Sequence, residues 1–176
     1  MKYHLGCGNK RLENFINIDM QTSDAVDVVD DISSLQSVAD CSAEVIYACH
    51  CLEHFGRNEV KDVLVCWFEK LAFGGTLRLA VPDFDAVVQR YLQNKNMKEL
   101  YGLLYGGQRN EYDYHKFTFT FESLKEMLEE IGFKNVRRYD WRDTEHSNVD
   151  DYSQSYLPHM QKETGTLMSL NVEANK

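Results

Sequence analysis

The sequence has few of the features that mark disordered, secreted or membrane-spanning chains. Only two of its 176 residues are proline and 43% are hydrophobic, which favours a compact globular protein with little disordered sequence. No apolar run reaches the roughly 18 residues that a membrane-spanning helix requires. The N-terminus enters an apolar stretch with glycine at once and shows no long signal-peptide core. We therefore expect a cytoplasmic protein without a membrane span.

Positive charge is also scarce. The chain carries 19 Lys and Arg residues against 28 Asp and Glu residues, for a formal net charge of -9. Because nucleic-acid affinity rests on patches of Lys and Arg, this balance argues against nucleic acid as a partner. Nucleic acid is therefore a poor candidate substrate.

The cysteines do not form a disulfide framework. Their number is five, an odd count without the spacing of secreted proteins, which favours free thiols in a reducing compartment. A chain of this length can bury a core without disulfides or a structural metal. We therefore predict a single domain over residues 1–176.

The first half of the chain alternates between strand-like and helix-like patterns. The predicted strands cover residues 2–5, 15–19, 26–32, 44–48 and 76–81. From Asn58, apolar residues recur at helical spacing, so we predict a helix that Asn58 caps and Gly74 ends. This alternation implies an α/β fold with a mostly parallel sheet and helices on both faces.

The second half continues the pattern after Pro82 and then loosens. Helices are predicted over residues 84–92, part of 97–105 and 124–131, with Gly132 as the final stop, and strands near residues 136–140 and 167–173. Residues 141–163 are predicted to be a long loop. Residues 94–118 end in a polar, aromatic-rich stretch, which we interpret as a lid or acceptor-binding segment.

Unusual residues follow the first three predicted strands. Gly6 and Gly8 allow close approach of a ligand to the backbone, Asp19 can accept hydrogen bonds from a ribose diol, and Asp31 with Ile32 offers an acceptor and an apolar surface to a base. In an open parallel sheet, ligands bind outside the carboxyl ends of the strands. Features of this kind at successive strand ends predict one nucleotide-like site.

The fourth strand runs into residues 48–55, "ACHCLEHF". Read as H-x-x-E-H, the segment matches a zinc signature in which His50 and His54 bind the metal and Glu53 acts on bound water. That arrangement needs a regular helix and a third ligand, whereas the segment begins at a strand end. We therefore predict no metal site, keep a zinc-dependent hydrolase as an alternative, and interpret Glu53 as an acid favoured at a helix N-terminus.

Five segments together resemble the class I S-adenosylmethionine-dependent methyltransferases. They are "YHLGCGNKRLENFINIDM", "VVDDISSL", "EVIYACHCLEHF", "LAFGGTLRLAVPDFD" and "FTFESLKEMLEEIGFKNV", within residues 2–140. The ending "GTLMSLNVEANK" is similar to the last strand of that fold, paired antiparallel with the strand near Val136. The resemblance implies a Rossmann-like, doubly wound sheet and S-adenosyl-L-methionine as cofactor.

The resemblance also implies how the cofactor is bound. Gly6, Cys7 and Gly8 line its methionyl part, Asp19 holds the ribose, Asp31 and Ile32 border the adenine, and Ala48, Cys49 and His50 lie beside the sulfonium. Methyl transfer requires in-line alignment and, for a hydroxyl acceptor, removal of a proton, for which imidazole is suited. We predict His50 and His115 as catalytic residues. Similar enzymes with this "LEH" ending suggest an oxygen or nitrogen acceptor in a sugar or cell-surface polysaccharide precursor.

Two features depart from the family pattern. About eight residues separate the first two strands, too few for a helical crossover, so the first helix must be reduced or lost. Little sequence precedes the first strand, so the cover over the cofactor is expected from residues 94–118 or from a second copy in a homodimer. A cofactor-binding but inactive subunit is therefore a second functional hypothesis.

Overall fold

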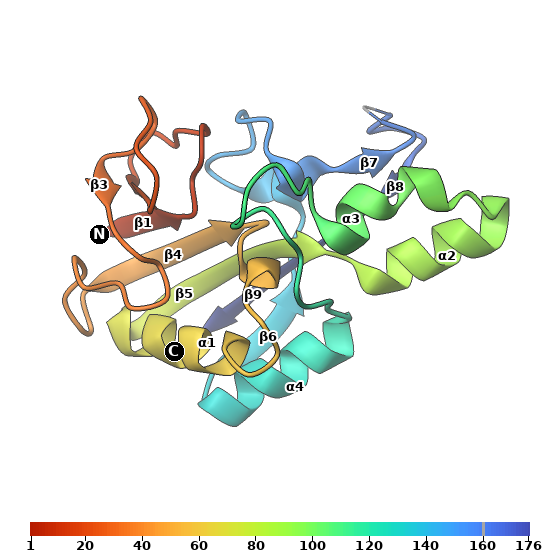
Figure 1. Ribbon diagram of the computed structural model, residues 1–176. Coiled ribbons are helices and arrows are strands. Elements are labelled where there is room, and N and C mark those ends of the chain that lie inside the picture. Colours follow the sequence, from red (N-terminus) through yellow and green to blue (C-terminus); the bar gives the residue numbers. More distant parts are fainter. Residues whose placement is uncertain (160) are drawn as a thin grey trace.

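A seven-stranded sheet forms the centre of the protein, in a computed structural model that describes residues 1–159 and 161–176 (Figure 1). Its strands are β1 (Lys2–Leu5), β2 (Ile16–Asp19), β3 (Val28–Val29), β4 (Ala43–Cys49), β5 (Leu71–Pro82), β6 (Lys134–Arg138) and β9 (Ser169–Asn175). β7 (Tyr156–Leu157) and β8 (Thr166–Leu167) form a separate two-stranded sheet. The α-helices are α1 (Val60–Lys70), α2 (Phe84–Asn94), α3 (Tyr101–Tyr105) and α4 (Phe121–Ile131).

The strand order confirms the predicted Rossmann-like class. It runs β3-β2-β1-β4-β5-β9-β6, and the chain reverses its direction of travel across the sheet between β1 and β4. β1 pairs in parallel with both β2 and β4, while β9 is antiparallel to β5 and β6 as predicted. Ligands of such sheets bind where the strand order reverses, beyond the carboxyl ends of the strands.

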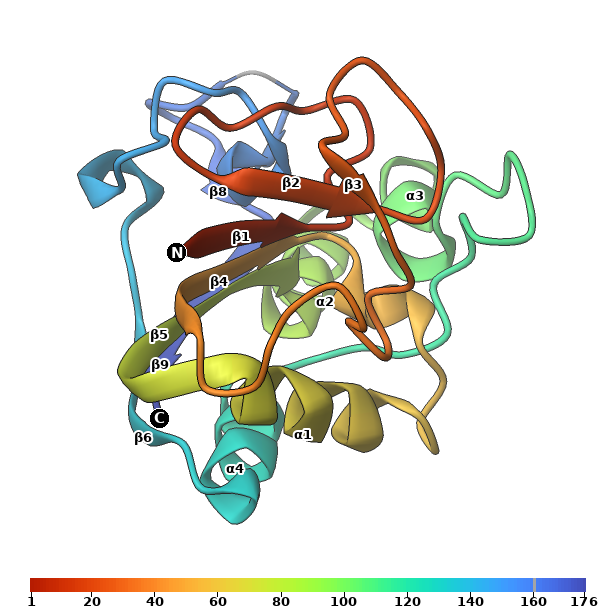
Figure 2. The same ribbon diagram turned by 90° about the vertical axis from the view of Figure 1, so that its left-hand side faces the viewer.

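The two faces of the sheet are covered differently. In β4, Ile46 and Ala48 join the main core beneath α1 and α4, whereas Tyr47 and Cys49 face the other side. Figure 2 shows α1 and α4 together below the sheet. In the described part of the chain, the 3₁₀ helix η4 (Tyr152–Gln154) packs on β5 and β9 at the other face. Tyr47 donates a hydrogen bond to Asp151 there, so residues 141–155 are more ordered than the predicted loop.

The short connection from β1 to β2 contains no helix, as predicted. In place of a helix, the buried side chain of Asn17 holds this connection together. Asn17 donates to the carbonyl oxygens of Leu12 and Phe15 and accepts from the Leu12 N–H, and it also bonds His4 at 3.0 Å. Because these groups are buried and paired, the crossover is held without an α-helix.

The predicted ends of α1 were wrong. The residue before its first turn is Glu59 rather than Asn58, with no capping hydrogen bond from its side chain, and the helix ends at Lys70. Leu71 already pairs with Ala43, so pairing with β4 starts before Gly74, which lies inside β5 with φ of +77°. The stop at Gly132 after α4 was predicted correctly. No helix in the described part of the chain is both long and apolar enough to cross a bilayer.

Asp83 connects the end of β5 to α2, and its substitution tests this joint. Its Oδ1 accepts from the backbone N–H groups of Asp85 and Ala86, and its Oδ2 pairs with Arg138 at 3.2 Å. We expect Asp83→Ala to lower the free energy of unfolding by about 1–2 kcal/mol, because it removes the cap. Asp83→Asn keeps a capping oxygen and should lose less than half as much in urea denaturation. Equal losses in the two variants would contradict a capping role.

Candidate active site

A cavity of about 870 Å³ opens at the carboxyl ends of β1, β2 and β4. Its walls come from the turn after β1, the residues that follow β2 and β3, the segment after β4, the start of α1 and the loop after α3. Of the residues predicted to bind a ligand, Gly6, Gly8, Asp19, Asp31, Ile32 and His50 line this cavity. The structure therefore brings together the ends of four strands that the sequence separates.

The glycine turn after β1 passes very close to the segment after β4. Gly6 has φ of +62°, and a Cβ atom built there would lie 2.7 Å from the Cβ of Cys51. Gly8 also has a positive φ, of +55°, but a Cβ atom there would meet nothing within 4 Å. Both glycines of the turn have a backbone conformation that favours glycine, but of the two only Gly6 also lacks room for a side chain.

Asp19 ties this turn to the end of β2. Its Oδ2 accepts a hydrogen bond from the Gly8 N–H at 2.8 Å, and its Oδ1 accepts from the Gln21 N–H at 2.9 Å. A carboxylate has about four lone-pair positions, so it can still accept from a ligand in the cavity. The position suits the ribose contact predicted for Asp19.

The segment after β3 is fixed to helix α1. Trp67, which is fully buried, donates from Nε1 to the carbonyl oxygen of Ile32 at 2.7 Å. Asp31 accepts from the Ser33 N–H and so closes a local turn. The Ile32 side chain forms an apolar wall of the cavity beside the Asp31 carboxylate.

Three residues predicted to touch the cofactor are not lining residues. Cys7, Ala48 and Cys49 are buried beneath the cavity. Burial raises the pKa of the Cys7 thiol to about 12 and that of Cys49 well above its usual range, so neither thiol is a reactive nucleophile at neutral pH. The Cys7 N–H and carbonyl bond Ile18 and Lys10 within the turn. That Cys7, Ala48 and Cys49 contact a cofactor therefore stays a prediction.

The segment after β4 is not a regular α-helix. β4 ends at Cys49, His50 has φ of +49°, and the 3₁₀ helix η1 (Leu52–His54) follows. The His50 N–H bonds the carbonyl oxygen of Ala80 at 2.7 Å. His50 and His54 are therefore not placed one turn apart on an α-helix, as the zinc signature H-x-x-E-H requires.

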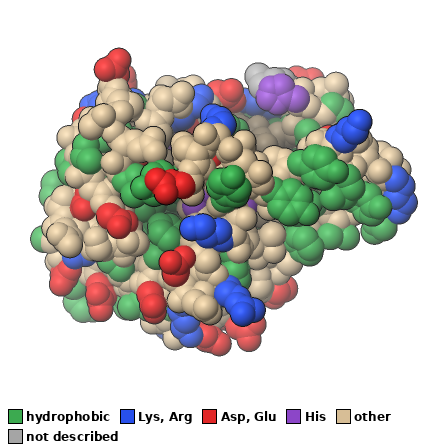
Figure 3. All heavy atoms as spheres, in the orientation of Figure 1, with side chains coloured by type: hydrophobic (Ala, Val, Ile, Leu, Met, Phe, Trp, Pro, Cys, Tyr) green, Lys and Arg blue, Asp and Glu red, His purple; other side chains and the backbone are tan. Residues whose placement is uncertain are grey.

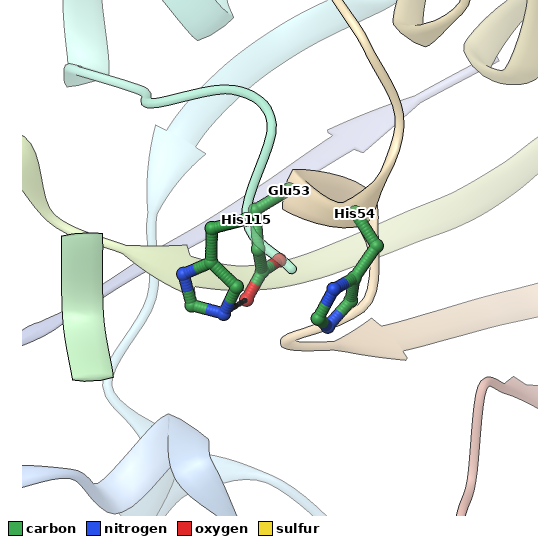
Figure 4. A group of neighbouring side chains, drawn as sticks. All are labelled: Glu53, His54 and His115. Carbon is green, nitrogen blue, oxygen red and sulfur yellow. Dashed lines mark ion pairs between the residues drawn. The ribbon is translucent and has the colours of Figure 1, made fainter. Parts of the chain in front are cut away.

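A compact group of ionisable side chains occupies the floor of the cavity. One carboxylate oxygen of Glu53 and one nitrogen each of His54 and His115 lie within 4.8 Å of one another (Figure 4). Glu53 Oε1 also lies 3.4 Å from His50 Nδ1 and 3.7 Å from His115 Nε2. His50 and His54 line the cavity, whereas Glu53 and His115 lie behind it.

Burial controls the protonation of this group. It raises the pKa of Glu53 to about 8 and lowers that of His50 to about 3, the latter with help from His115 and His54. The pKa of His115 is also lowered, mainly by burial. Glu53 lies in the first turn of η1, as expected for an acid near a helix N-terminus, but its side chain is fully buried, which the sequence did not indicate.

The loop after α3 supplies cavity residues that pattern analysis did not single out. Arg109, Asn110, Tyr112, Asp113 and Lys116 line the wall opposite the glycine turn. The N–H groups of Lys116 and Phe117 donate to the Glu53 carbonyl at 2.8 and 3.2 Å, which docks the loop on the segment after β4. Only its polar, aromatic composition marked this loop in the sequence.

The surface around the site carries mixed charge. On the face seen in Figure 1, acidic and basic side chains are interspersed, with hydrophobic side chains gathered over α2 and α3 (Figure 3). Among the exposed large hydrophobic residues there are Leu92, Tyr101 and Tyr105. This face shows no broad field of Lys and Arg such as a nucleic-acid site requires.

Comparison with solved structures identifies the fold. A methyltransferase of Burkholderia thailandensis, the 1,6-didemethyltoxoflavin-N1-methyltransferase, aligns over 99% of this chain and 70% of its own, with a TM-score of 0.62 and 15% identity. An S-adenosylmethionine-dependent methyltransferase of Archaeoglobus fulgidus aligns over 99% and 85%, with a TM-score of 0.60 and 15% identity. One from Thermotoga maritima covers 100% and 82%, with a TM-score of 0.57 and 14% identity. No family model and no curated protein sequence matches the chain.

The close approach at Gly6 has a measurable consequence. We expect Gly6→Ala to lower the free energy of unfolding by about 2–4 kcal/mol, because it adds a clash with Cys51 to the cost of a left-handed conformation. Gly8→Ala carries only the conformational cost and should lose about 1 kcal/mol. Urea denaturation of both variants measures the difference. Equal losses would show that the contact with Cys51 is unimportant.

Proposed function

We propose that the protein is a methyltransferase that binds S-adenosyl-L-methionine in this cavity and transfers its methyl group to an oxygen or nitrogen of a small polar acceptor. One observation carries the proposal. The glycine turn, Asp19, the Asp31–Ile32 pair and His50 all line a single cavity at the point where the strand order reverses. That point is where α/β sheets of this kind bind nucleotide-like ligands.

The geometry supports a specific orientation of the cofactor. Asp19 ends β2 and accepts from the ribose hydroxyls, while Asp31 and Ile32 border the adenine. The methionyl part lies along the Gly6–Gly8 turn, where the lack of side chains allows close approach. Cys7, Ala48 and Cys49 contribute through their backbone at most, since their side chains are buried. The Burkholderia neighbour was solved with S-adenosylhomocysteine bound, which supports this choice of cofactor.

The rest of the cavity suits a polar acceptor. Arg109, Asn110, Tyr112, Asp113 and Lys116 line the same cavity as His50 and offer both donors and acceptors. Such a lining favours a ligand rich in hydroxyl groups, in agreement with the sugar or cell-surface polysaccharide precursor expected from the sequence. Residues 106–117 thereby act as the acceptor-binding part of the predicted segment 94–118.

The reaction requires alignment and the loss of a proton. The acceptor atom attacks the methyl carbon as the carbon–sulfur bond breaks, the electron pair stays on sulfur, and the acceptor proton passes to the group formed by His50, Glu53 and His115. His50 lines the cavity and His115 lies behind it, and we assign both to activation of the acceptor. His50 alone is a weak base, because burial lowers its pKa to about 3. Proton removal therefore involves Glu53 and His115 as well as His50.

Cofactor binding is the first test. Calorimetric titration with S-adenosylmethionine and S-adenosylhomocysteine should show micromolar affinity, and Asp19→Ala should weaken it at least about tenfold, since a carboxylate hydrogen bond to a ligand is worth about 1.5–3 kcal/mol. Asp40→Ala is the matched control, because Asp40 is an exposed acid paired with Lys70 outside the cavity. Absence of binding by the folded wild-type protein would overturn the proposal. Binding without any turnover would favour the inactive-subunit hypothesis.

The acceptor loop gives a second test. A Cβ atom at Gly106 would lie 2.3 Å from the carbonyl oxygen of Asp113, so Gly106→Ala must displace the loop, whereas Gly102→Ala in α3 meets nothing within 4 Å. We expect Gly106→Ala to lower the rate at which S-adenosylhomocysteine is formed at least about tenfold, across a panel of hydroxyl and amine acceptors. Its affinity for S-adenosylmethionine should stay near that of Gly102→Ala. A loss of cofactor affinity instead would place the loop on the cofactor.

A further inference from the structure

Four side chains, two that line the cavity and two behind it, present an unusual combination of atoms. Glu53 and His54 come from the segment after β4, and His115 comes from the loop after α3 (Figure 4). His50, which precedes them in the segment after β4, lies beside Glu53. Their separations are short, with 3.4 Å between Glu53 Oε1 and His50 Nδ1 and 3.7 Å between Glu53 Oε1 and His115 Nε2. The hydrogen bonds around them decide which of these atoms carry protons.

Two of the histidines present a free Nε2 lone pair. His115 Nδ1 lies 2.9 Å from the carbonyl oxygen of Leu103, and His54 Nδ1 lies 3.0 Å from that of Tyr114. Because a carbonyl oxygen only accepts, both Nδ1 atoms must carry the proton. In the neutral imidazoles Nε2 is then an acceptor. This is the arrangement by which proteins orient metal-binding histidines.

His50 presents the opposite nitrogen. Its Nε2 lies 3.2 Å from Ser169 Oγ, and Ser169 donates its single proton to Asn171 Oδ1 at 2.8 Å. Asn171 is held in this orientation because its Nδ2 donates to the Ser153 carbonyl. Ser169 must therefore accept from His50 Nε2–H, which leaves the Nδ1 lone pair of His50 directed at Glu53.

The carboxylate oxygens of Glu53 are hydrogen-bond acceptors, and so are the imidazole nitrogens that face them. Its side chain is fully buried, and neither carboxylate oxygen has a hydrogen-bond partner among the described residues. Three imidazole lone pairs and a carboxylate thus converge in a site of low dielectric constant. Such a set is unfavourable unless a proton or a cation lies among its members.

We propose that Glu53, His54 and His115 hold a divalent first-row transition-metal ion at the floor of the cavity, with His50 Nδ1 adjacent as a further ligand. Two imidazoles and one carboxylate form a common ligand set for such ions, whereas Mg²⁺ and Ca²⁺ prefer oxygen ligands alone. Ligand atoms at about 2.0–2.2 Å from an ion lie within about 4.4 Å of one another, so the observed 4.8 Å limit requires shifts of under about 1 Å.

The protein scaffold holds these ligands in place independently of an ion. The Glu53 carbonyl accepts from the N–H groups of Lys116 and Phe117, which joins the two ligand-bearing segments directly beside His115. The Nδ1 bonds of His54 and His115 fix the orientation of both rings. A site whose ligands are positioned before the ion arrives is the arrangement that favours tight and selective binding.

The ion would have a role in the reaction proposed above, and that role rests on the proposed function. His50 and His54 line the cavity, so one side of the site is open to the acceptor. A divalent ion lowers the pKa of a hydroxyl group that it binds, and an ion held here would activate a hydroxyl acceptor in this way. The inference therefore narrows the acceptor to a hydroxyl compound.

Titration with Mn²⁺ in the absence of S-adenosylmethionine tests the site. Calorimetry should show about one strong Mn²⁺ site per chain, and Mn²⁺ should raise the melting temperature of the wild-type protein. Glu53→Gln and the milder His54→Ala should each weaken Mn²⁺ affinity at least about tenfold and abolish the thermal shift. His159→Ala is the matched control, because His159 is exposed and lies outside the cluster.

The outcomes separate this inference from the proposed function. No Mn²⁺ binding by the folded wild-type protein at about 1 mM, or equal binding by Glu53→Gln, His54→Ala and wild type, would overturn the metal site and leave a shared proton among the four groups. Titration of the same preparation with S-adenosylmethionine tests the cofactor separately. Metal binding without cofactor binding would support the site and overturn the methyltransferase proposal.

Discussion

The close approach of two strand ends is the constraint on which the site depends. β1 lies between β2 and β4 and pairs in parallel with both, so the turn that leaves β1 must pass directly beside the segment that leaves β4. At Gly6 this leaves 2.7 Å between a hypothetical Cβ and Cys51, a space that no side chain can occupy. The same contact places the glycine turn, Asp19 and His50 around one cavity. Parallel pairing thereby converts separate chain segments into a single binding surface.

Hydrogen bonds to the backbone of the irregular segments then give this surface its shape. Asp19 holds Gly8, Trp67 holds Ile32, and the Glu53 carbonyl holds the loop that ends at Phe117. Each bond joins an irregular segment to a regular element or to another segment of the cavity wall. Because loops lack internal hydrogen-bond ladders, such anchors determine where their side chains point.

Burial decides the chemistry at the floor of the cavity. In water Glu53 would be ionised at neutral pH and a His side chain would take up a proton near pH 6.5, but here desolvation raises the pKa of Glu53 and lowers that of His50, so the neutral form of both is favoured. The surrounding network directs lone pairs rather than protons toward Glu53. These converging acceptors link the proposed metal site to the proposed transfer reaction. An ion bound by them would stabilise negative charge on the acceptor oxygen as its proton is lost.

Local sequence patterns determined much of the architecture. Apolar periodicity placed most strands and helices, and the residues after the first three strands pointed to the cavity wall before its shape was known. The patterns failed at Asn58 and Gly74, because pairing of Leu71 with Ala43 takes precedence over a local helix signal. The burial of Glu53 and its meeting with His115 were decided only by tertiary structure. They depend on a loop that docks through backbone hydrogen bonds, and backbone groups are the same in every residue, so no side-chain pattern encodes them.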